Sequence, residues 1–219
     1  YQDMFVFRAP LMVLAVVTMV YGAFLTLAQT DAKRFCACST ISQISYSVFG
    51  IMALTPMGIK GSLFYFLSHI LGKALLFSTA GILVYRTGTR DLGKMSGLGK
   101  RMPLTLGLWM VSAMVLSALP PFSGFVGKWL FVTGGFQALG KDAPGVIFMA
   151  GAVLSTLLTL IYTFKTGIRI FFGQPNSDHQ KVKDAPAAMA VPLICLAVLT
   201  LILGIFPGPV LSFFAMVIR

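Results

Sequence analysis

Two lysines and one histidine lie inside stretches of sequence that are otherwise apolar enough to be buried in a lipid bilayer. Lys128 closes the stretch ALPPFSGFVGK, while His69 and Lys73 are four residues apart in FLSHILGKALLF and therefore share one face of a helix. A lysine at the centre of a membrane helix costs about 2.5 to 3.5 kcal/mol even on lenient insertion scales. Lysine and histidine side chains both exchange protons, so these three residues have the ingredients of a proton relay.

Lys128 follows a stretch that interrupts a helix, because Pro120, Pro121 and Gly124 fall within a few residues of one another. Broken backbone at membrane depth is tolerated only where protein or water satisfies its polar groups, and transporters use such breaks near the midplane. Simpler interpretations stay open at this point. The prolines can make a plain kink, Lys128 can snorkel to an interface, and His69 can be an ordinary core residue.

The elements that position these residues must be membrane helices. The chain has 219 residues, of which 57% are hydrophobic and 11% charged, and its mean hydropathy is +0.88. Its apolar runs have helix length rather than the alternating pattern of a barrel, which predicts an all-α polytopic transmembrane bundle in contact with the lipid bilayer. The net charge of +11 does not indicate nucleic acid, because the basic residues lie in short loops between apolar runs.

Seven apolar runs are visible, and the fourth and fifth are only about 24 Å long as helices, which is shorter than the hydrocarbon layer. The runs are about 9–29, 36–55, 61–85, 103–118, 124–139, 145–172 and 188–216. Only PPFSG separates the two short runs. They form either two tilted spans or two halves of one interrupted span.

The distribution of positive charge distinguishes the two topologies, because an extra crossing changes the side of every later loop. Two separate spans divide the loop lysines and arginines nine to six, whereas one broken span divides them eleven to four. The second division predicts six spans, with one discontinuous helix at about 103–139. The loops QTDAKRF, RTGTRDLGKMSGLGKR and KTGIRIFFGQPNSDHQKVKDAP are then cytoplasmic.

Polar side chains recur at helical spacing on two further spans, which indicates either a hydrated interior or helix-packing contacts. They are Ser39, Gln43, Tyr46 and Gly50 on the second span, and Ser155, Thr159, Tyr162 and Thr163 on the fifth. No catalytic, cofactor-binding or metal-ligand motif accompanies them. The three cysteines fit neither a disulfide framework nor a four-ligand metal site.

Four motifs, in this order and spacing, resemble the proton-conducting antiporter family: AQTDAKRFCACSTISQISY, SHILGKALLF, RDLGKMSGLGKRMP and ALPPFSGFVGKW. This family contains Mrp-type cation/proton antiporter subunits and the antiporter-like membrane subunits of respiratory complex I and membrane-bound hydrogenases. The resemblance weakens after about residue 173. By general appearance, the end of the fifth span is most similar to Mrp D-type and hydrogenase-associated members.

The resemblance implies a fold of fourteen transmembrane helices with two inverted five-helix repeats. Residues 1–219 would then be one transmembrane domain, a C-terminal fragment with the second repeat at about 9–172 and a final peripheral helix at about 188–216. Lys128 matches the charged residue of the discontinuous helix, which is Glu in some members. His69 matches the histidine of the preceding helix, and Lys73 matches a lysine that only part of the family has.

These observations together predict a proton-translocating subunit of the inner cell membrane, with Lys128, Lys73 and His69 facing one interior path. Its expected partners are other membrane subunits of a multisubunit complex, together with protons; co-transport of Na⁺ stays open. No catalytic site is visible in this chain, and two settings stay open: an Mrp-type antiporter, or the ion-translocating subunit of an NADH:quinone oxidoreductase-like or hydrogenase complex. The alternatives are a membrane scaffold that moves no ions and an unrelated carrier with a midplane substrate site.

Overall fold

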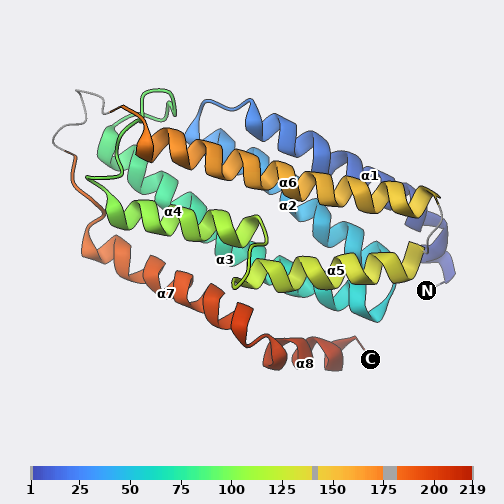
Figure 1. Ribbon diagram of the computed structural model, residues 1–219. Coiled ribbons are helices and arrows are strands. Elements are labelled where there is room, and N and C mark those ends of the chain that lie inside the picture. The colour runs from blue at the N-terminus through green and yellow to red at the C-terminus, as the bar shows by residue number, and fades with distance from the viewer. Residues whose placement is uncertain (1, 140–142, 175–181, 219) are drawn as a thin grey trace.

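The computed structural model describes residues 2–139, 143–174 and 182–218, and over these residues all regular structure is helical (Figure 1). The helices pack side by side into one elongated bundle. They are α1 Gln2–Leu27, α2 Ala32–Met52, α3 Pro56–Thr87, α4 Pro103–Leu116, α5 Ser123–Leu139, α6 Ala143–Phe172, α7 Ala187–Ile205 and α8 Gly208–Val217. The predicted all-α membrane bundle is thereby confirmed.

Five stretches in α1, α2, α3, α6 and α7 are each long and apolar enough to cross a membrane. Helices α4 and α5 have only 14 and 17 residues, or about 21 and 26 Å. Figure 1 shows them end to end, so that together they run the length of the bundle. The sixth crossing is therefore one discontinuous helix, as the charge distribution predicts.

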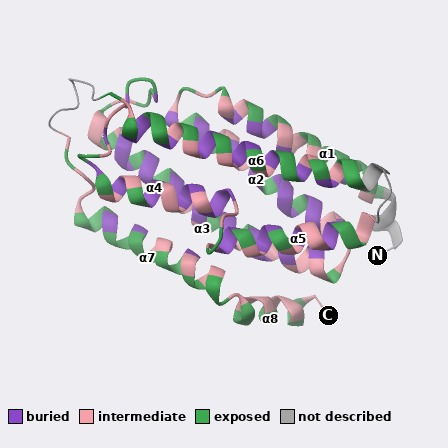
Figure 2. Ribbon diagram, in the orientation of Figure 1, coloured by how far each residue is buried: buried purple, intermediate pink, exposed green. Residues whose placement is uncertain are grey.

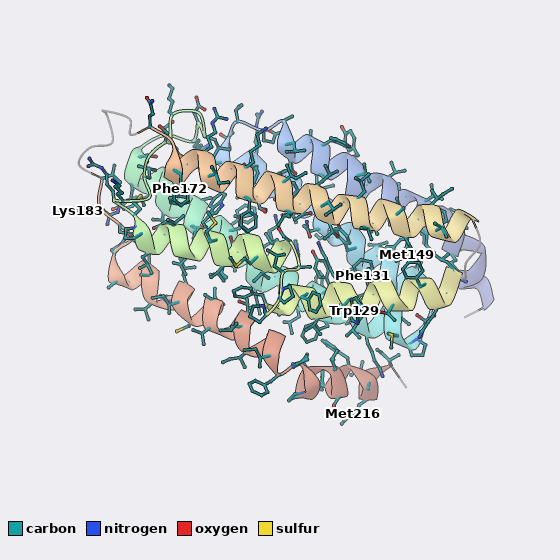
Figure 3. The ribbon with its side chains drawn as sticks, viewed as in Figure 1. Trp129, Phe131, Met149, Phe172, Lys183 and Met216 are labelled. Carbon is teal, nitrogen blue, oxygen red and sulfur yellow. The ribbon has the colours of Figure 1, made fainter. Side chains whose placement is uncertain are left out.

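The basic loops meet at one end of the bundle. The amide of Ala32 donates to the carbonyl oxygen of Arg90 at 2.9 Å, and the amide of Leu98 donates to that of Ile170 at 3.2 Å. Figure 3 places Lys183 at this same end. The α1–α2 and α3–α4 loops therefore lie beside the last turn of α6, as a single broken crossing requires; positions 141 and 181 lie outside the described residues.

Local capping explains where several helices begin and end. Asp31 caps α2 by accepting hydrogen bonds from the amides of Lys33 and Arg34, at 2.8 and 2.9 Å. Gly88, with φ of +71°, ends α3 in the left-handed region. Helix α4 is capped from a distant segment, because the carboxylate of Asp184 accepts from the amide of Leu104 at 2.7 Å.

The core lies on the inward faces of α1 to α6, whereas α7 and α8 are mostly exposed or half-buried (Figure 2). The apolar run expected as one helix at 188–216 forms two, because the chain breaks at Pro207. Helix α7 buries three residues and α8 none. Yet α7 lies against the interruption itself: a Cβ on Gly204 would be 2.0 Å from the carbonyl oxygen of Pro121.

Candidate functional site

The interruption between α4 and α5 is an ordered turn that satisfies almost all of the backbone groups at the end of α4. Ala118 adopts a left-handed conformation, with φ of +58°. Its amide donates to the carbonyl oxygen of Val115 at 3.2 Å, and the amide of Leu119 donates to that of Met114 at 2.9 Å. This pair of bonds is a Schellman motif, which normally has glycine at the left-handed position.

The carbonyl oxygen that this motif leaves available belongs to Leu116, the last residue of α4, and it accepts a hydrogen bond from Lys128 Nζ at 3.0 Å. The C-terminal end of a helix carries about half a negative charge, so it attracts an ammonium group. Lys128 lies one to two turns into α5 and is only 4% exposed. The C-terminal end of α4 thus binds the ammonium group of a lysine on α5.

A close approach of the two half-helices makes this contact possible. Gly124, in the first turn of α5, has so little space that a Cβ would lie 1.8 Å from the carbonyl oxygen of Val115. Any side chain at this position would therefore separate α5 from the end of α4. The glycine of the PPFSG stretch matters for this contact as well as for interrupting the helix.

Aromatic rings surround the rest of the Lys128 ammonium group. Nζ lies 4.2 Å from the ring centroid of Tyr46 on α2 and 5.3 Å from that of Tyr65 on α3. Such rings attract cations through their quadrupole, most strongly where water is excluded. The chain has no glutamate, and among the described residues no carboxylate pairs with Lys128. One carbonyl dipole and two aromatic faces therefore stabilise this charge.

Lys73 occupies a second buried position, on the opposite side of His69 from Tyr65 along α3. Its Nζ donates to the carbonyl oxygen of Cys36 at 3.1 Å and to the hydroxyl of Ser39, both on α2. The side chain is 6% exposed, so Lys73 points into the bundle rather than toward lipid. Both lysines are thus held by neutral acceptors and not by acidic partners.

His69 lies between Tyr65 and Lys73 along α3. It is one turn from Lys73 and one turn from Tyr65, whose ring centroid is 6.3 Å from that of the imidazole. Tyr65 in turn contacts Lys128, so the Tyr65 ring adjoins both the imidazole and that lysine. Its Nδ1 is buried without a hydrogen-bond partner among the described residues. A buried ring nitrogen without a partner is costly, and it remains available for proton exchange.

Gln43 joins three helices beside this row of residues. Its Nε2 donates to Thr159 Oγ1 at 2.7 Å and to the hydroxyl oxygen of Tyr162 at 2.9 Å, both on α6. Its Oε1 accepts a hydrogen bond from the hydroxyl of Tyr65 on α3. Gln43 is fully buried, so the network fixes the orientation of Tyr65 and hence one of the two rings against Lys128.

The structure brings together the residues that sequence analysis singled out. Lys128 lies at the interruption, Lys73 and His69 share one face of α3, and two members of the polar stripes, Gln43 and Thr159, bind each other. Tyr65 was not among the predicted site residues. The sequence does contain a signal for it, because Tyr65 lies four residues before His69 and therefore on the same helical face.

The second polar stripe also includes a residue with a packing role, Ser155, which acts together with Ser42 of α2. Ser42 and Ser155 both donate to the carbonyl oxygen of Met19 on α1, at 2.7 and 3.1 Å. These bonds connect α1, α2 and α6. Ser155 therefore helps to pack α1 against α6, whereas Gln43 and Thr159 contact the candidate site through Tyr65.

A discontinuous membrane helix whose ends receive buried charged groups defines a class: polytopic proteins built like transporters, with functional groups near the midplane. Comparison with known proteins identifies the family. Residues 3–159 match the family described as "NADH:quinone oxidoreductase/Mrp antiporter, TM". The chain belongs to this family.

Individual relatives agree with this assignment. The chain is 34% identical over 203 residues to a Na(+)/H(+) antiporter subunit from Alkalihalophilus pseudofirmus, covering 93% of this chain and 40% of the relative. It is 31% identical over 211 residues to NADH-quinone oxidoreductase subunit N of Desulforudis audaxviator, covering 91% and 41%. The chain therefore spans about two fifths of the length of these relatives.

Solved structures show the same fold. A chain of respiratory complex I from Thermus thermophilus superposes with a TM-score of 0.84 at 28% identity, covering 99% of this chain and 46% of that one. A chain of the Mrp complex from Dietzia sp. gives a TM-score of 0.86 at 27% identity, covering 95% and 46%. Both neighbours are chains of membrane complexes, and this chain shares their membrane-embedded, antiporter-like fold.

Proposed function

We propose that this chain is the part of a proton-translocating subunit that moves protons through Lys128, His69 and Lys73. The subunit would work beside other membrane subunits in an assembly of the Mrp-antiporter, complex I or hydrogenase type, in the inner cell membrane and with the basic end of the bundle in the cytoplasm. The observation that carries the proposal is the row Lys73, His69, Tyr65 on one face of α3, which ends at the ring beside Lys128.

The proposed path follows this row. Lys128 exchanges protons with the side reached through the interruption, and His69 passes protons between Lys128 and Lys73. Each transfer moves one proton from an ammonium or imidazolium donor to a neutral amine or imidazole acceptor, so no other reactant is needed. Repulsion between like charges couples the steps, because a proton that arrives at Lys73 weakens the hold of its neighbours on theirs.

The two rival functions are less compatible with these observations. A scaffold would gain nothing from two buried cations that each cost about 2.5 to 3.5 kcal/mol even on lenient scales. An unrelated carrier is disfavoured because the family match runs through residues 3–159 and includes both lysines.

The test is Lys128→Met in the full-length protein, assembled in its complex and reconstituted in proteoliposomes. We expect proton transport to fall about 100-fold or more, the usual contribution of an essential proton-transfer group, while Lys128→Glu retains part of it. Lys60→Met is the matched control, because Lys60 is a half-buried lysine near the N-terminal end of α3 and lies outside the proposed path.

Assembly of every variant is checked on native gels before transport is measured. Normal transport by a correctly assembled Lys128→Met complex would remove Lys128 from the mechanism. Equal losses in Lys128→Met and Lys60→Met would mean that the effect comes from charge removal in general. Lys73→Met tests the far end of the row, and unchanged transport in that variant would exclude Lys73.

A further inference from the structure

A small polar cavity of about 70 Å³ lies at the basic end of the bundle, between the last turns of α1 and α6. It is separate from the row of residues around Lys128, and what it binds is independent of the proposed transport function. The cavity is lined by Leu27, Gln29, Leu92, Lys165, Thr166 and Arg169. Its volume is suited to one small polyatomic group rather than to a large ligand.

The cavity carries positive charge from two side chains of α6. Lys165 and Arg169 are four residues apart and therefore lie on the same face. Both are exposed, and within the described part of the chain neither makes a hydrogen bond or an ion pair. Asp91 lies near Arg169, since a Cβ on Gly93 would be 3.0 Å from Asp91 Oδ1 and 3.1 Å from Arg169 Nη2. The same Oδ1 already accepts a hydrogen bond from the amide of Gly93 at 2.8 Å.

Two neutral side chains add hydrogen-bond donors. Thr166 brings a hydroxyl, and Gln29 brings the N–H that remains after its Nε2 donates to the carbonyl oxygen of Leu25 at 3.0 Å. A guanidinium, an ammonium, a hydroxyl and an amide around one small space are the donor set that recognises phosphate. Attraction to the C-terminal dipole of α6 would account for Arg169 alone, but not for a cavity that Gln29 also lines.

The position of the cavity indicates where a phosphate would come from. Lys165 lies about 10 Å before the last residue of α6, within its apolar span, so its long side chain can extend toward the headgroups at the basic end of the bundle. Exposed apolar side chains continue toward the bilayer centre on both flanking helices, with Tyr21 and Phe24 on α1 and Ile161 on α6. Acyl chains can lie against these side chains while a headgroup reaches the cavity.

We infer that this cavity binds the phosphate of an anionic phospholipid from the leaflet at the basic end of the bundle. Basic pockets between membrane helices on this side are suited to anionic headgroups, and each basic residue near the surface contributes favourably to binding. The two cations provide the attraction. Thr166 and Gln29 orient the phosphate oxygens, and the exposed faces of α1 and α6 hold the lipid tails.

The experiment measures binding of phosphatidylglycerol and phosphatidylcholine to the delipidated full-length protein in its complex. The double variant Lys165→Gln, Arg169→Gln should bind phosphatidylglycerol about thirtyfold more weakly than the wild type. The double variant Lys33→Gln, Arg34→Gln is the matched control, since it removes two exposed charges at the same end but outside the cavity. Its affinity should stay within about threefold of wild type.

Thr166→Asp provides a second variant that keeps both basic residues and places a negative charge in the cavity, so it should also weaken binding. Equal losses in both double variants would overturn the inference, because they would indicate attraction to the whole basic surface. Equal binding of phosphatidylcholine and phosphatidylglycerol would overturn it too. If inorganic phosphate alone displaced phosphatidylglycerol at millimolar concentration, the site would belong to a soluble anion and the lipid proposal would be wrong.

Discussion

Replacing Gly124 with alanine should separate the two halves of the broken helix. The added Cβ would lie 1.8 Å from the carbonyl oxygen of Val115, whereas an ordinary contact is at least 3.4 Å, so the halves must move apart by about 1.6 Å (3.4 minus 1.8). Leu116 is the next residue along α4. A shift of that size is enough to break its 3.0 Å bond to Lys128 Nζ.

The expected cost is about 2 kcal/mol or more, because overpacking a well-packed site costs about 1 to 3 kcal/mol and a hydrogen bond to a charged group adds to it. The matched control is Gly107→Ala on α4, where a Cβ would meet nothing within 4 Å and alanine favours the helix. The free energy of unfolding of the full-length protein is measured by denaturation in mixed micelles, and proton transport is measured in parallel.

The two substitutions should change the free energy of unfolding in different directions. Gly107→Ala should be neutral or stabilising by up to about 1 kcal/mol, with transport unchanged. Gly124→Ala should lose both stability and transport. If Gly124→Ala is as stable as Gly107→Ala, the close approach of α4 and α5 does not hold the interruption together. If it is unstable but still transports normally, the contact between Leu116 and Lys128 is not needed for proton movement.

Three further outcomes are expected. Ala118→Gly should raise the free energy of unfolding by up to about 1 kcal/mol, because glycine relieves the left-handed conformation at φ of +58°; destabilisation would contradict this. Asp31→Ala should cost about 1 kcal/mol at pH 7, and Asp31→Asn much less, because the side chain caps α2. Hydrogen bonds from the backbone, that of Arg34 first, lower the pKa of Asp31, so its ionised form stabilises the fold above the unfolded pKa near 3.9. This ionic contribution is lost as the pH falls through the lower folded value, and unfolding measured from pH 6 to 3 should show the Asp31→Ala difference shrinking. In intact cells, single cysteines introduced into the protein at positions 90 and 181 should be labelled from the cytoplasm, and a cysteine at 141 from the other side. Labelling of positions 90 and 181 from opposite sides would exclude the single broken crossing.

Features that depend on one stretch of chain could be predicted from the sequence. Pro120, Pro121 and Gly124 mark the interruption, and the count of loop charges decides between one crossing and two. Spacing alone placed His69 and Lys73 on one helical face. The end of α7 was missed although GIFPGP contains two prolines and two glycines, because the apolar run on both sides outweighed that signal.

Features that depend on how helices face one another could not be predicted. Gln43 contacts Tyr65 only because α2 and α3 pack in a particular register, and periodicity within one helix carries no information about register. Asp184 caps α4 from 80 residues along the chain for the same reason. Likewise, the carbonyl oxygen of Leu116 becomes the acceptor for Lys128 only after the Schellman turn has engaged the carbonyls before it.

Because of that last contact, the protonation state of Lys128 affects how strongly α4 and α5 are held together. A neutral amine can still donate to the carbonyl oxygen of Leu116, but it loses the attraction to the end of α4, which is worth about 0.3 to 2 kcal/mol. The joint between α4 and α5 is therefore tighter when Lys128 is protonated and looser when it is not. Gly204 of α7 packs against the carbonyl oxygen of Pro121, in the same interruption. Loss of a proton from Lys128 would therefore also loosen the packing of α7, on the outer surface of the bundle.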